Sequence, residues 1–188
     1  MFGQLIAALK SGDRLDTAFA EFIQMVDASE WMFHEANQVI CGKKKAEDVG
    51  DSLYEKDKEI NHLLRSVRAG ILTHLSVNPI ADIPGCLALM SVAKDAERIG
   101  DYCKNVYEVG RYYEDDYSID RYHDPLEDVR KRTRELFGAV REAFDKSSVK
   151  RAKSSIKMAD RNRGECDAIE ETLLRDRREV PTHVAVAY

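Results

Sequence analysis

The sequence predicts an all-α protein, built as tandem antiparallel three-helix bundles of which the second lacks most of its last helix. Apolar residues recur at steps of three and four through five long segments, which is the spacing of amphipathic helices. Only 10 glycines and 4 prolines occur in 188 residues, so few positions oblige a helix to end. Long helices joined by short connections pack naturally as antiparallel bundles.

The first half contains three predicted helices. We expect them from Leu15 to about Cys41, from Ala46 to about Leu75, and from about Ile83 to about Tyr113. Gly42 suits the position after the first helix, where glycine enters the left-handed region at little cost. The pair Asn78-Pro79 ends the second helix, because the residue before proline is pushed out of the helical region.

The second half restarts the pattern after an acidic, tyrosine-rich stretch at residues 112–122. A helix is predicted at 126–144, following Pro125, and another at about 149–178. Residues 182–188 resemble the opening turns of one more helix.

These helices divide the chain into three parts. Residues 1–13 form a short leader, residues 14–115 the first three-helix repeat, and residues 122–188 a second repeat that is incomplete at its C-terminus.

Composition narrows the classes of function. A formal net charge of −5 disfavours a nucleic-acid partner. The four cysteines are widely spaced with no C-x-x-C pair, which favours reduced thiols and a cytoplasmic location. The first five residues lack a basic region and a small-residue cleavage site, so we expect no secretory leader. No apolar run approaches the roughly 20 residues of a membrane span. We therefore expect a soluble protein that is peripheral to a membrane at most.

An acidic pair on the third helix is the main candidate site. Glu97 and Asp101 are four residues apart and so share one helix face, which we expect to point outward, away from the apolar face. Such a pair is usually solvated, here beside Arg98 or Lys104. Gly100, between the two carboxylates, could permit close helix approach or pack against the first helix.

The segment AKDAERIGDYCKNVYEVG at 93–110, on the third predicted helix, resembles the most recognisable motif of the PhoU family of phosphate-uptake regulators. The segment DKEIN at 57–61 resembles its D-x-x-I-N element on the second helix. The Asn78-Pro79 pair also lies where such proteins carry a proline between helices two and three.

The resemblance implies a surface metal site. PhoU-like proteins are tandem three-helix bundles that hold metal clusters through E/D-x-x-x-D motifs. Glu97 and Asp101 match that motif, while Asp57 and Asn61 match the second-helix element. These four residues are the implied ligands, and oxygen donors of this kind suit iron, zinc, manganese or magnesium.

The resemblance also implies a non-enzymatic function. PhoU-like proteins regulate phosphate transport and phosphate-responsive two-component signalling. The implied partners are the ATPase of a phosphate ABC transporter or a phosphate-sensing histidine kinase. A homo-oligomer is compatible with the sequence as well.

Two alternatives stay open at this point. Glu59 and His62 form one E-x-x-H step, of the kind used twice in di-iron bundles, so a di-iron or hydrolytic metalloenzyme is the first. No second copy of that step and no nucleophile motif accompanies it. The second is a fragment of a PhoU-like accessory domain of a sodium–phosphate cotransporter.

Overall fold

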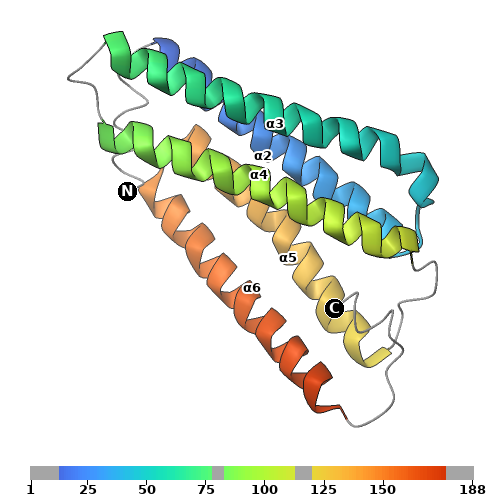
Figure 1. Cartoon of the computed structure of the whole chain (residues 1–188). Helices are drawn as coiled ribbons and strands as arrows, with labels where there is room; N and C mark the ends of the chain where they lie inside the picture. Colours follow the sequence, from blue (N-terminus) through green and yellow to red (C-terminus); the bar gives the residue numbers. More distant parts are fainter. Residues whose placement is uncertain (1–12, 78–82, 113–119, 177–188) are drawn as a thin grey trace.

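A computed structural model describes residues 13–77, 83–112 and 120–176. Within these residues the chain forms five α-helices and no strand, so the all-α prediction is confirmed. In chain order the helices are α2 (Asp13–Ile40), α3 (Ala46–Val77), α4 (Ile83–Tyr112), α5 (Asp120–Asp145) and α6 (Val149–Arg175), as Figure 1 shows.

Helices α2, α3 and α4 form a three-helix bundle in which each packs against the other two. They run in alternating directions (Figure 1). On α3 the buried residues Leu53, Ile60 and Val67 are seven positions apart, which is the repeat that keeps one helix face on its neighbours. The largest fully buried side chains of the bundle are Leu15, Met25, Met32, Leu53, Ile60, Val67, Ile71 and Leu89.

The turn between α2 and α3 follows the sequence prediction. Gly42 has φ of +67°, the left-handed conformation that favours glycine, and its N–H donates to the Val39 carbonyl at 2.9 Å. The three lysines at 43–45 are exposed. Lys44 reaches back to the carboxylate of Glu35 at 2.7 Å. The turn is therefore solvated and closed by local hydrogen bonds.

Small side chains let α4 come close to α2. Ala93, Ala96 and Cys103 on α4 are all buried. The Ser29 hydroxyl of α2 lies 3.1 Å from the Ala96 carbonyl and 2.9 Å from that of Met25, so its oxygen is satisfied inside the core. The small residues at these buried positions leave room for the contact with α2.

Helices α5 and α6 form a second, two-helix unit. They pack against each other as an antiparallel hairpin (Figure 1). Ser148 caps α6, with its hydroxyl accepting the Arg151 N–H at 3.3 Å. In Figure 1 the hairpin diverges from α4 toward the start of α5 and the end of α6.

Aromatic contacts join this hairpin to α2. The Phe144 ring of α5 lies 5.1 Å from Phe22 in an edge-to-face arrangement and 5.7 Å from Phe19, between ring centroids. Farther along, Phe137 and Phe33 are 5.7 Å apart. These rings continue the core of the first bundle onto α5.

Polar contacts also join α5 to α2, alongside the aromatic ones. Arg141 of α5 pairs with Asp27 at 2.6 Å and also with Glu30 on α2. Arg134 lies 2.7 Å from Nδ1 of His34. The α2–α5 contact therefore combines an aromatic strip with a strip of ion pairs.

Two boundaries in the second half differ from the prediction. Helix α5 begins at Asp120, so Pro125 lies inside it, whereas we expected the helix to follow that proline. A proline near a helix start removes only one backbone hydrogen bond, which the neighbouring turns tolerate. Helix α6 ends at Arg175, three residues before its predicted end at 178.

Several predictions fall outside the described residues. They are the break at Asn78-Pro79, the leader before Asp13 and the helical stub at 182–188. The division into 1–13, 14–115 and 122–188 stays a prediction. Among the described helices, none is both long and apolar enough to cross a membrane.

Candidate functional site

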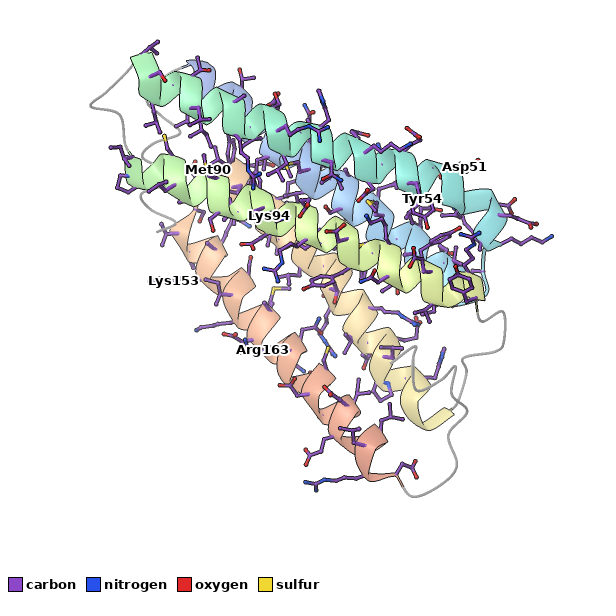
Figure 2. The ribbon with its side chains drawn as sticks, viewed as in Figure 1. Asp51, Tyr54, Met90, Lys94, Lys153 and Arg163 are labelled. Carbon is purple, nitrogen blue, oxygen red and sulfur yellow. The ribbon has the colours of Figure 1, made fainter. Side chains whose placement is uncertain are left out.

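Polar side chains line the contact between α3 and α4. We call this row the α3–α4 seam. Its members are Tyr54, Asp57, Asn61, Asp101, Lys104 and Glu108, continued along α4 by Glu97 and its ion-pair partner Lys94. Figure 2 labels Tyr54 on α3 and Lys94 on α4, at separate points along the seam. The Tyr54 hydroxyl donates to Glu108 at 3.1 Å near one end. All four predicted metal ligands belong to this row.

Lys104 lies at the centre of the seam and joins two of those four residues. Its Nζ is 3.0 Å from Oδ1 of Asp57 and 2.9 Å from Oδ1 of Asp101. Burial by itself lowers the pKa of Lys104, but the hydrogen bonds to Asp101 and Asp57 outweigh it and raise the pKa above its usual value. The ammonium therefore stays protonated between the two carboxylates.

Asn61 supports Asp57 from the next turn of α3. Its Nδ2 donates to the Asp57 carbonyl at 3.1 Å and lies 3.4 Å from Oδ2 of the same residue. The Asp57 side chain is 15% exposed. Asp57 is thus held from both sides, by an amide of its own helix and by the Lys104 ammonium of α4.

The outward orientation predicted for the acidic pair is wrong for Glu97. Glu97 is 9% exposed, whereas the Asp101 side chain is 47% exposed. Glu97 is three residues before Gly100, which packs on Ile60 of α3, and four before Asp101, which shares Lys104 with Asp57 of α3, so it belongs to the flank of α4 that meets α3. A helix with two packing partners has a wide buried face. Lys94 pairs with the Glu97 carboxylate.

Gly100 lies at a close contact of α4 with α3. A Cβ added there would be 3.1 Å from Cδ1 of Ile60 on α3 and 3.7 Å from Sδ of Met32 on α2. Both readings of this glycine hold, since it permits close helix approach and also packs against α2. The approach brings Asp57 and Asp101 within reach of one lysine.

The arrangement does not fit the implied metal. Of the four implied ligands, Asp57 and Asp101 converge, but they converge on an ammonium group. Glu97 is directed to Lys94, and Asn61 presents its N–H₂ rather than its oxygen to Asp57. Within residues 13–77, 83–112 and 120–176, no three His, Cys, Asp or Glu side chains gather as a metal-holding group.

The E-x-x-H step of the metalloenzyme alternative lies on the solvent side of α3. Glu59 and His62 are both exposed. The Glu59 carboxylate accepts a hydrogen bond from Lys56 at 2.7 Å. Neither side chain is therefore held at a converging, partly buried position, as a first-row metal site in a bundle would require.

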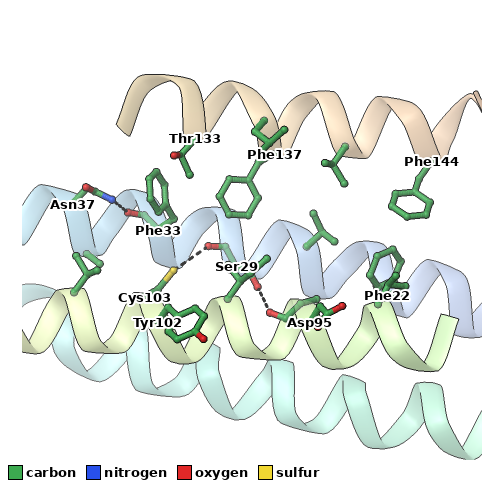
Figure 3. A pocket seen from close by; sticks show the side chains of 18 residues that line it. Phe22, Ser29, Phe33, Asn37, Asp95, Tyr102, Cys103, Thr133, Phe137 and Phe144 are labelled. Atoms are coloured by element: carbon green, nitrogen blue, oxygen red, sulfur yellow. Dashed lines mark hydrogen bonds between the residues drawn. The ribbon is translucent and has the colours of Figure 1, made fainter. Parts of the chain in front are cut away.

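An apolar groove runs between α2, α4 and α5 (Figure 3). Its volume is about 420 Å³, and Phe33 and Phe137 face each other across one wall. Burial raises the pKa of the Cys103 thiol in its floor to about 12. The thiol lies 3.8 Å from the Ser29 carbonyl. Such a group stays protonated at neutral pH and is a poor nucleophile.

Sequence reasoning missed this groove. Its walls come from helices far apart in the chain, including Ile99 and Tyr102 on α4 and Leu136 on α5. Ile99 is 39% and Tyr102 57% exposed although both are large and apolar. Tyr102, an aromatic residue outside the predicted apolar face of α4, was a signal of the groove in the sequence.

Comparison with known families identifies the bundle that carries the seam. The family model for the PhoU domain matches residues 22–110, from within α2 to the last turn of α4. Residues 22–110 of the chain belong to the PhoU-domain family. The match includes the whole of the seam, so the resemblance drawn from 57–61 and 93–110 is confirmed. No curated protein and no solved structure matches the chain. PhoU-domain proteins are regulators connected with phosphate rather than enzymes.

Proposed function

We propose that this PhoU-domain protein is a cytoplasmic regulator that restrains phosphate uptake or phosphate-responsive signalling by binding other proteins. The match of the PhoU domain to residues 22–110 is the observation that carries the proposal. It spans three helices that form one packed bundle. The bundle would serve as the rigid body on which the contact surfaces are displayed.

The polar groups of the described bundle support a binding function rather than a catalytic one. The seam carboxylates of Asp57, Asp101 and Glu97 each have a lysine partner within the same two helices. Catalytic acids and bases need instead a free proton-accepting or proton-donating atom directed at a substrate. The apolar groove contains a protonated, buried thiol at Cys103 and few polar side chains.

The proposed partners are the ATPase subunit of a phosphate ABC transporter or a phosphate-sensing histidine kinase. Either partner would bind to the outer faces of the helices. The chain would act on it by binding and not by transferring a chemical group. The metal prediction does not enter this proposal, because the implied ligands are paired with lysines and with each other.

Affinity capture tests the proposal. The tagged chain is expressed at its native level in phosphate-replete and in phosphate-starved cells, and the captured proteins are identified. We expect the ATPase subunit or the kinase, in amounts that change with phosphate supply. The purified partner should then bind the purified chain directly. Capture of neither component under either condition would contradict the proposal.

A further inference from the structure

We infer that Lys104 is the resident cation of the α3–α4 seam and makes the bundle independent of metal. Two carboxylates from different helices, Asp57 and Asp101, meet at one point. The point is taken by an ammonium group that belongs to the chain. The inference concerns this chain's own side chains and does not rest on the proposed regulatory function.

The distances fit an ammonium ion better than a metal. The two carboxylate oxygens lie 3.0 and 2.9 Å from Nζ, which are ordinary lengths for a charge-assisted N–H···O bond. Oxygen ligands lie about 2.0–2.2 Å from magnesium or zinc and about 2.3–2.6 Å from calcium. A metal at this point would require the two helices or their side chains to move closer.

The number of oxygen ligands at this point also fits an ammonium ion better than a metal ion. Asp57 and Asp101 supply the two oxygens, and Asn61 adds an amide N–H directed at Asp57. The next carboxylate along α4, Glu97, is buried and paired with Lys94. A hard divalent ion needs about six oxygen ligands or ordered waters in their place. One ammonium with three N–H donors is satisfied by far fewer groups.

The positive charge of Lys104 stabilises the helix contact by offsetting the repulsion between the Asp57 and Asp101 carboxylates. Without it, two carboxylates would face each other across a helix contact in which the Asp57 side chain is 15% exposed. Repulsion between like charges is screened weakly at such a site. A tethered lysine removes that repulsion at all metal concentrations. The α3–α4 contact should therefore not respond to metal supply.

Thermal unfolding of the purified full chain tests the inference. Each protein is freed of metal with a chelator and then titrated with Mn²⁺ or Zn²⁺, while Tm is recorded and bound metal is measured by elemental analysis. For the wild type we expect no bound metal and no saturable rise in Tm. A saturable rise that is lost in Asp57→Asn or Asp101→Asn would overturn the inference.

Substitutions test the role of the charge. Lys104→Met should lower Tm by about 4 °C or more, because two facing carboxylates lose their counterion. Lys104→Arg should retain most of the wild-type Tm. Adding Asp57→Asn to Lys104→Met should recover part of the loss, because only one carboxylate then remains.

Lys58→Met is the matched control. Lys58 also pairs with a carboxylate three residues away on a helix, but both partners, Lys58 and Glu55, are 70% exposed. Its Tm should change by less than about 2 °C. Equal Tm values for Lys104→Met and the wild type would contradict the inferred role. The metal titration of the wild type remains decisive if Lys104→Met does not fold.

Discussion

Gly110 of α4 lies directly against the backbone of Ile40 in α2. A Cβ at Gly110 would be 2.8 Å from the Ile40 nitrogen and 2.9 Å from its Cα. Backbone atoms cannot rotate away, so Gly110→Ala would force the two helix ends apart. We expect the free energy of unfolding to fall by about 2 kcal/mol, as measured by urea denaturation.

Gly138 provides the control for that substitution. It lies inside α5, and an added Cβ would meet no atom within 4 Å. Gly138→Ala should raise stability by about 0.5–1 kcal/mol, because alanine is the better helix former. Equal effects at Gly110 and Gly138 would show that the close contact between α4 and α2 is absent in solution.

The aromatic contact between α5 and α2 should make a large contribution to stability. Phe144 is 8% exposed and packs against Phe19 and Phe22. Phe144→Ala should lower the free energy of unfolding by about 3 kcal/mol in urea denaturation. Ile156 on α6, which is 60% exposed, is the control, and its alanine variant should lose less than about 1 kcal/mol. Similar losses for the two variants would contradict the packing described.

Alkaline pH should destabilise the protein through Cys103. Burial raises the pKa of its thiol to about 12 in the folded chain, above the usual value that applies to the unfolded chain. The resulting stability is complete below the usual thiol pKa and is lost as pH rises toward 12. Between these two pKa values the free energy of unfolding falls by at most about 1.4 kcal/mol per pH unit.

Comparison with Cys103→Ala isolates this effect from other groups that titrate at high pH. Unfolding free energies are measured by urea denaturation between about pH 8.5 and 10.5. The wild type should lose stability more steeply than the variant. Parallel pH dependences would mean that the Cys103 thiol is not protected from ionisation by the fold.

The thiols should also differ in reactivity. Cys86 and Cys103 are buried, whereas Cys166 is exposed. Because alkylation requires access to the sulfur, native protein treated with iodoacetamide should be modified at Cys166 and protected at the two buried sites until denaturant is added. Peptide mass analysis measures each position. Rapid modification of Cys103 in native protein would contradict its place in the core.

The helices were predictable because local signals specify them. The apolar spacing located α2, α3 and α4 to within a few residues, and Gly42 marked the end of α2 through its left-handed φ. Pro125 misled the prediction, since a proline near a helix start can be accommodated by the turns around it.

The site was less predictable, because it depends on which neighbour each face meets. Glu97 belongs to a flank that becomes buried only when α3 packs beside it. Lys104 was recognised as a partner for the acidic pair, but its second contact is with Asp57, which lies 47 residues earlier in the chain on another helix. Helical periodicity locates the apolar face of each single helix but does not show which other helix packs on that face. Joint burial and cross-helix pairing require the assembled bundle.

The uptake of labelled phosphate tests the proposed function most directly. The rate is measured in phosphate-replete cells that contain the chain, that lack it, and that lack it but carry a restored copy. If the protein restrains phosphate uptake or signalling, deletion should raise the rate and the restored copy should return it to the original value. Equal rates in all three strains, in replete and in starved cells, would contradict the account.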